Sequence, residues 1–241
     1  MPITGVAIVV LFALGSSMAH AASVAIDVGH YLARPGATSA RGVPEFEYNL
    51  TLAREIADAL RARGHDVMMI GDDGLAADLY RRAPRAAGRD LLISVHHDSV
   101  QPEYMSYWDF EGGLLRYSDM QSGYSLFVSR RNPHLATSLA CASAFGAALQ
   151  AAGFVPSRYH ADPVVGEARE YADEDNGVHY YDNLVVLHTA AIPALLFEAG
   201  VLVNRQEELA MRDPEVRARI ARSAADAVDT CLLPSNAADR R

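Results

Sequence analysis

The stretch LLISVHHDS (Leu91–Ser99) decides the fold of this chain of 241 residues. Its opening run, LLISV, is largely apolar, which is typical of a central strand covered on both faces in a parallel sheet. Polar side chains begin where this run ends, with His96 and His97. Because successive side chains of a strand point to opposite faces, we expect only one of the two histidines to join a site at this edge.

Similar apolar runs alternate with helical patterns on both sides of this stretch. We expect strands at 24–28, 67–70, 91–95, 124–128, 184–187 and 194–197, and helices at 44–63, 75–88, 134–152 and 214–231. This alternation predicts an α/β fold: a single domain with a mostly parallel, twisted sheet of about six strands, flanked by helices on both faces. Ligands of such sheets bind beyond the carboxyl ends of the strands.

Two long stretches, 100–121 and 154–182, lack this periodicity and are expected to form loops. The first holds Tyr104, Tyr107 and Trp108, which would form either a wall that binds a sugar or peptide, or a plain apolar cover over the sheet. The second is rich in acidic residues and tyrosines. It is expected to be either an ordinary solvated loop or a lid that regulates access to a site.

Three more residues are expected at the same edge of the sheet as His96. His30 ends the strand-like VAIDVGH, Glu198 follows the apolar run PALLF, and Glu45 opens an amphipathic helix. Two neutral imidazoles and one carboxylate form a catalytic zinc site with one position left for water. A second glutamate beside that water can serve as base and then as acid.

Each of these residues also has a plainer interpretation. A loop histidine is often a surface residue, and a glutamate at a helix start complements the helix dipole. A glutamate after an apolar run is often a buried partner in a salt bridge. Glu47 is the rival of Glu45 as a ligand, but its position on the helix, farther from the apolar stripe, favours exposure to solvent.

Composition narrows the range of functions. The net charge of −9 argues against a nucleic-acid partner, because phosphate binding requires clustered Lys and Arg. The uncharged, apolar start of the chain predicts a signal peptide at 1–21, cut after Ala21, with an uncleaved anchor as the alternative. The catalytic domain would then span 22–235, followed by a disordered tail at 236–241.

The chain has two cysteines, Cys141 and Cys231, both in helix-like stretches. In an exported protein they would form a disulfide, and otherwise they would be two buried free thiols. No CxxC motif is present in the sequence, so a zinc site built on cysteines is not supported.

The candidate segments together resemble the zinc-dependent N-acetylmuramoyl-L-alanine amidases of bacterial cell-wall turnover, the amidase 3 family. IDVGH resembles the family's I-D-x-G-H, EFEYNL its E-K-x-x-N-L, LYRRAPRAAGRDLL its R-x-x-x-A-N region, LLISVHHDS its S-I-H-A-N, and LHTAAIPALLFEAGVLVN its L-R-x-x-x-x-P-x-x-L-x-E-x-G-F-x-x-N. These motifs occur in order across nearly the whole chain after the signal peptide. The resemblance implies that His30, Glu45 and His96 bind zinc and that Glu198 is catalytic.

The chain departs from the family pattern close to these residues. His97-Asp98 stands in place of Ala-Asn, and His188 in place of the usual Arg ahead of the catalytic strand. We therefore expect His97, Asp98 and His188 to contact substrate or to lie behind the metal ligands. Asp98 would either accept a hydrogen bond from a ligating histidine or cap a turn.

The resemblance implies an enzyme that uses one zinc ion per chain to hydrolyse the amide between N-acetylmuramic acid and L-alanine in peptidoglycan. It implies an exported protein, periplasmic or secreted, and leaves open an activator protein as a partner. No membrane span is expected after signal cleavage. The alternatives are a zinc peptidase of similar fold that acts on other peptides, and a catalytically inert cell-wall binding or regulatory protein.

Overall fold

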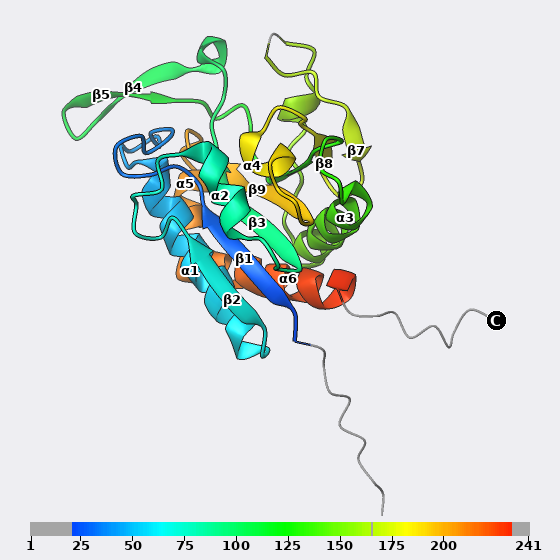
Figure 1. The fold of residues 1–241 in the computed structure, drawn as a ribbon. Helices are drawn as coiled ribbons and strands as arrows, with labels where there is room; N and C mark the ends of the chain where they lie inside the picture. Colours follow the sequence, from blue (N-terminus) through cyan, green and yellow to red (C-terminus); the bar gives the residue numbers. More distant parts are fainter. Residues whose placement is uncertain (1–20, 165, 233–241) are drawn as a thin grey trace, which may run out of the picture.

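A computed structural model describes residues 21–164 and 166–232 of the chain. Within these residues the main sheet has seven strands in the order β2-β1-β3-β9-β6-β8-β7 (Figure 1). They are β1 (Ser23–Val28), β2 (Asp66–Ile70), β3 (Leu91–Asp98), β6 (Ser125–Val128), β7 (Tyr171–Asp173), β8 (Val178–Tyr180) and β9 (Ala194–Val201). Neighbours are parallel except at β6–β9 and β7–β8, which confirms an α/β domain with a mostly parallel sheet.

Helices cover both faces of the sheet, as expected. The larger apolar core lies under α1 (Glu45–Ala62), α3 (Leu135–Ala151) and α6 (Pro214–Leu232), and the smaller one under α2 (Arg82–Arg85) and α4 (Val185–His188). The other short elements are α5 (Glu207–Arg212) and 3-10 turns at Leu79–Arg81, Pro102–Tyr104 and Tyr159–Ala161. Val95 of β3 enters the larger core and Leu92 the smaller, so His96 and His97 point to opposite faces of the sheet.

Two expected elements differ in the structure. The strand expected at 184–187 is the helix α4, because so short an apolar run does not distinguish a strand from a buried helical turn. The helix expected at 75–88 is reduced to a 3-10 turn and the short α2. Pro84 cannot donate the backbone hydrogen bond that a longer helix needs. The side chain of Asp78 caps the 3-10 turn by accepting a hydrogen bond from the backbone N–H of Tyr80 (3.0 Å).

Both stretches expected to be loops contain strands. The first forms an antiparallel hairpin of β4 (Ser106–Phe110) and β5 (Gly113–Tyr117), which projects from the body of the domain (Figure 1). Its turn, Glu111-Gly112, has positive φ at both positions (53° and 77°), the geometry that matches the twist of the paired strands. The stretch 154–182 supplies β7 and β8 at the far edge of the main sheet, which is therefore larger than expected.

The cysteines and the termini complete the fold. Cys141 in α3 and Cys231 in α6 form a disulfide, the first of the two alternatives. No helix in 21–164 or 166–232 combines the length and apolar character needed to cross a bilayer. The expected signal peptide at 1–21, apart from Ala21, and the expected tail at 236–241 lie outside the described residues.

Candidate active site

Three side chains that the sequence predicted as metal ligands lie close together at the carboxyl edge of the sheet. His30 follows β1, Glu45 is the first residue of α1, and His96 lies on β3. Glu45 Oε2 is 3.0 Å from His30 Nε2, and Glu45 Oε1 is 3.2 Å from His96 Nδ1. One ligand atom from each of the three residues lies within 4.8 Å of the other two.

This set of donors fits a zinc ion. At ordinary zinc–ligand distances, neighbouring ligand atoms of a tetrahedral ion are about 3.3 Å apart, close to the two contacts that Glu45 makes. Burial raises the pKa of Glu45, but hydrogen bonds and charge interactions with His30 and His96 outweigh burial and hold this pKa well below its usual range. The carboxylate is therefore in the ionised form that binds a cation.

The main chain approaches the donors closely at two glycines. A Cβ on Gly29 would lie 2.5 Å from the ring of His96, and one on Gly36 would lie 2.3 Å from Glu45 Oε2. His30 itself has a φ of 66°, which is uncommon for a residue with a Cβ. The loop between β1 and α1 thus depends on residues without side chains at the points where it passes the donors.

Asn49 and His97 lie behind Glu45 and fix its orientation. Asn49 Nδ2 donates to Glu45 Oε1 (2.9 Å), and Asn49 Oδ1 is 2.8 Å from His97 Nδ1. The backbone N–H of His97 also donates to Glu45 Oε1 (3.3 Å). Burial, partly offset by the charge of Glu45, lowers the pKa of His97 to about 3, so this buried imidazole is neutral.

Arg82 lies in the stretch LYRRAPRAAGRDLL, whose pattern predicted no role for it; in the structure it fixes the turn that carries His30. Its buried guanidinium donates to Asp27 Oδ1 (2.7 Å) and to the carbonyl of Val28 (2.6 Å). It also donates to the carbonyls of His30 and Ala76. The available signal was Asp27 inside the apolar strand VAIDV, because a buried carboxylate requires a hydrogen-bonded or cationic partner.

Glu198 lies beside the three donors. It pairs in register with His96 across β9 and β3, so the two side chains lie on the same face of the sheet. Its Oε2 atom is buried and has no hydrogen-bond partner within the described part of the chain. Burial raises the pKa of Glu198 well above its usual range, and the charges of Asp98 and Glu45 raise it further. Such a carboxyl beside a candidate metal site is suited to proton transfer.

The structure places the remaining candidates around this centre. Asp98 Oδ2 is 2.7 Å from His160 Nε2, and Asp98 Oδ1 accepts the N–H of Ser99 (2.7 Å); neither contact involves a metal-site histidine. The contact between Asp98 and His160 ties the stretch 154–182 to the end of β3, and within that stretch His160 Nδ1 is 2.8 Å from Glu167 Oε2. His188 ends α4, and its buried Nδ1 has no partner among residues that the structure describes.

A cavity of about 260 Å³ opens beside the donors. His30 and His96 form part of its wall, and Leu184, Val185 and Leu196 make much of the rest apolar. The charged residues in its lining, Asp27 and Arg82, are already paired with each other. The cavity therefore offers room and apolar surface next to the candidate metal site.

Comparisons with known proteins show that the fold of this chain occurs in several solved structures. The chain is similar to Ami1 from Mycobacterium smegmatis (20% identity, 86% of this chain and 94% of that one, TM-score 0.66). It is also similar to the catalytic domain of CwlV from Bacillus (Paenibacillus) polymyxa var. colistinus (23%, 86% and 96%, TM-score 0.64). A third similar structure is CwlD from Clostridioides difficile in complex with the GerS lipoprotein (16%, 88% and 98%, TM-score 0.61).

At these identities the three structures support the fold. No curated protein sequence matches the chain. The Amidase_3 family model, described as N-acetylmuramoyl-L-alanine amidase, matches residues 24–230, which include all the site residues described above. A match over this much of the sequence means that the chain belongs to the Amidase_3 family of N-acetylmuramoyl-L-alanine amidases.

Proposed function

We propose that the protein is a zinc-dependent hydrolase that cleaves the amide between N-acetylmuramic acid and L-alanine in peptidoglycan. One observation carries this proposal: donor atoms of His30, Glu45 and His96 converge, and Glu198 occupies the adjacent register position of the sheet. These three residues would hold one zinc ion per chain, a Lewis acid that acidifies water and polarises a carbonyl group. Family membership supplies the class of substrate.

Glu198 is proposed as the general base and then the general acid. It would take a proton from the attacking water and deliver it to the nitrogen of L-alanine as the amide bond breaks. Its raised pKa favours the second step, because a carboxyl that holds its proton more tightly is available as an acid nearer to neutral pH. Asn49 and Arg82 would keep Glu45 and His30 aimed at the metal.

The role of Glu198 is tested by digestion of purified peptidoglycan followed by mass spectrometry. We expect the wild-type protein to release peptides that begin with L-alanine, and a chelator to stop this release. The variant Glu198→Gln should retain near-stoichiometric zinc but lose at least about a hundredfold in rate, the lower range for general acid–base catalysis. Normal turnover by Glu198→Gln would refute the role given to this residue.

The metal site is tested with a matched pair of glutamates in the first turn of α1. Glu45 is buried among the donors, whereas Glu47 is exposed. We expect Glu45→Gln to lose most of its bound zinc and its activity, because it removes a charged ligand. Glu47→Gln should retain both. Equal zinc content in the two variants, measured by atomic absorption, would contradict the assignment of Glu45.

The same measurements separate the alternative functions. Release of alanine-headed peptides from whole sacculi, with no cleavage of linear peptides, distinguishes the proposed amidase from a zinc peptidase. Near-stoichiometric zinc with turnover distinguishes it from an inert wall-binding or regulatory protein.

Location and partners follow from the proposed substrate. Because peptidoglycan lies outside the cytoplasm, we propose that the protein is exported, either periplasmic or secreted. The disulfide Cys141–Cys231 fits an oxidising compartment. CwlD was solved in complex with the GerS lipoprotein, and we propose that a binding screen look for a protein partner of this chain as well.

A further inference from the structure

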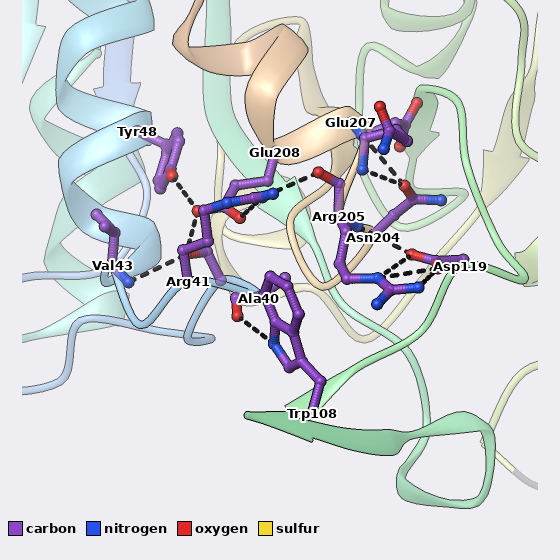
Figure 2. Close-up of polar contacts among 12 residues, drawn as sticks. Ala40, Arg41, Val43, Tyr48, Trp108, Asp119, Asn204, Arg205, Glu207 and Glu208 are labelled. Atoms are coloured by element: carbon purple, nitrogen blue, oxygen red, sulfur yellow. Dashed lines mark hydrogen bonds and ion pairs between the residues drawn. The ribbon is translucent and has the colours of Figure 1, made fainter. Parts of the chain in front are cut away.

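The β4–β5 hairpin has one face that is anchored to the domain. Trp108 lies on this face, and its Nε1–H donates to the carbonyl of Ala40 (2.9 Å). The guanidinium carbons of Arg41 and Arg205 lie 5.4 Å and 5.2 Å from its ring (Figure 2). Arg205 also stacks on Tyr117, 3.9 Å from its ring. These contacts fix the hairpin to the loop that precedes α1 and to the turn that follows β9.

The opposite face of the hairpin is exposed. Tyr107 and Arg116 are directly paired across the two strands, with the guanidinium carbon 5.9 Å from the tyrosine ring. Tyr107 is 58% exposed and Leu114 is 71% exposed. Of the aromatic residues that the sequence suggested as a wall, Tyr107 is thus available to a ligand. Trp108 is an anchor, and Tyr104 packs edge-on against another tyrosine.

A hollow of about 400 Å³ lies between the hairpin, the loop that precedes α1 and the segments just beyond β3 and β9. Leu114 and Arg116 line it from the hairpin, Ala37 from the loop between β1 and α1, and Ser99 and Val203 from just beyond β3 and β9. The N–H of Ala37 donates to Oε2 of Glu45 (3.0 Å). The wall of the hollow is therefore hydrogen-bonded directly to a candidate metal ligand.

Arg116 brings a free positive charge to this hollow. It forms no ion pair within residues 21–164 and 166–232, whereas Arg41 and Arg205, which contact the anchored face of the hairpin, are paired with Glu208 and Asp119 (Figure 2). In the cavity that His30 and His96 line, the arginine among the described lining residues, Arg82, is instead paired with Asp27. The two hollows beside the site therefore differ in charge.

We infer that the hollow under the hairpin receives the stem peptide of peptidoglycan and that Arg116 pairs with one of its carboxylates. This rests on the proposed function, which places the scissile amide at the metal site. On the glycan side of that amide, the lactyl carboxyl of muramic acid is consumed by the bond and no free charge remains, whereas the stem peptide carries free carboxylates. A guanidinium matches the planar geometry of a carboxylate, and Leu114 in the wall of the hollow offers apolar contact to the peptide chain.

The test compares two muramoyl pentapeptides, one with free stem carboxylates and one with the same carboxylates converted to amides. Wild-type protein should cleave both and favour the free acid. We expect Arg116→Gln to lower kcat/KM for the free acid about tenfold, mainly through KM, the scale of one charge-assisted hydrogen bond. Activity on the amide should not change. The control is Arg54→Gln, an exposed arginine on α1 that should leave both substrates unaffected.

The outcomes are distinguishable. An equal fall on both substrates, or no fall on either, overturns the assignment of the hollow and of Arg116. Failure of the wild-type protein to cleave either substrate counts against the proposed function instead. The unfolding temperature of Arg116→Gln is compared with that of the wild type. If the two are equal, a selective loss of activity on the free acid reflects recognition of the carboxylate rather than damage to the hairpin.

Discussion

Gly36 packs so closely against Glu45 that there is no room for a side chain at this position. Its φ is 83°, and an added Cβ would lie 2.3 Å from Glu45 Oε2 and 2.6 Å from the ring of His30. The variant Gly36→Ala must therefore displace the carboxylate or the imidazole. We expect its zinc affinity, measured by competition with a chelating dye, to fall about 10- to 100-fold, the range for losing a group that orients a ligand.

Gly64 provides the matched control for this prediction. Its φ of 87° is almost the same, but an added Cβ would meet nothing within 4 Å. Gly64→Ala should lower the free energy of unfolding by about 1–2 kcal/mol through backbone strain alone, with zinc affinity unchanged. A similar loss of zinc affinity in both variants would mean that strain, and not contact with the donors, explains the effect.

The sequence predicted which donors meet better than it predicted what holds them. His30, His96 and Glu198 each follow an apolar run, so their position at the carboxyl edge could be inferred from strand periodicity alone. Arg82 could not be recognised in this way, because its hydrogen bonds to the carbonyls of Val28 and His30 join segments more than fifty residues apart in sequence. The acidic Asp27 in an apolar strand indicates that a partner is needed, but it does not identify Arg82 as that partner.

Among the elements, α3 and α6 are joined by the disulfide between Cys141 and Cys231, which closes a loop of 90 residues. The double variant Cys141→Ser, Cys231→Ser should lose about 2–5 kcal/mol in the free energy of unfolding, measured in urea. Zinc content should not change, because the donors come from the edge formed by β1, β3 and α1. Wild-type protein treated with a reductant should show the same loss. A stability that does not respond to the reductant or to the variant would contradict this role.

The elements that carry the donors were predicted because each is long or fully buried. β1, β3 and β9 each contain a largely apolar, buried run, and α1 has a regular apolar stripe. The elements that were missed are short and owe their form to packing: α4 has four residues, and β7 and β8 have three each. At such lengths, tertiary contacts decide between strand, helix and loop.

At the scale of the whole molecule, the stretch 154–182 is bound to the catalytic edge through His160. Nε2 of His160 lies 2.7 Å from Asp98 Oδ2, and Nδ1 of His160 lies 2.8 Å from Glu167 Oε2. With this geometry a protonated imidazole can donate a hydrogen bond to each carboxylate. The sequence suggested either a solvated loop or a lid here. The contacts show a segment that pairs with the main sheet at one end and with the end of β3 at another.

We expect this bridge to make the stability of the protein depend on pH. Burial lowers the pKa of His160, but the charges and hydrogen bonds of Asp98 and Glu167 outweigh burial and raise it to about 9. In the unfolded chain a histidine has a pKa of about 6.5. Because the folded pKa is the higher one, the stabilisation is fully present below about pH 6.5 and is lost as the pH rises through about 9.

The difference in stability between wild-type protein and His160→Gln isolates this contribution from all other titrations. Urea unfolding at pH 6, 7.5 and 9.5 should show that the advantage of the wild type shrinks by up to about 3 kcal/mol as the imidazolium loses its proton. The exposed His134, at the start of α3, provides the control, and His134→Gln should leave the pH profile unchanged. A constant difference between wild type and His160→Gln across this range would show that His160 contributes by packing, since packing against Phe127 does not depend on its charge.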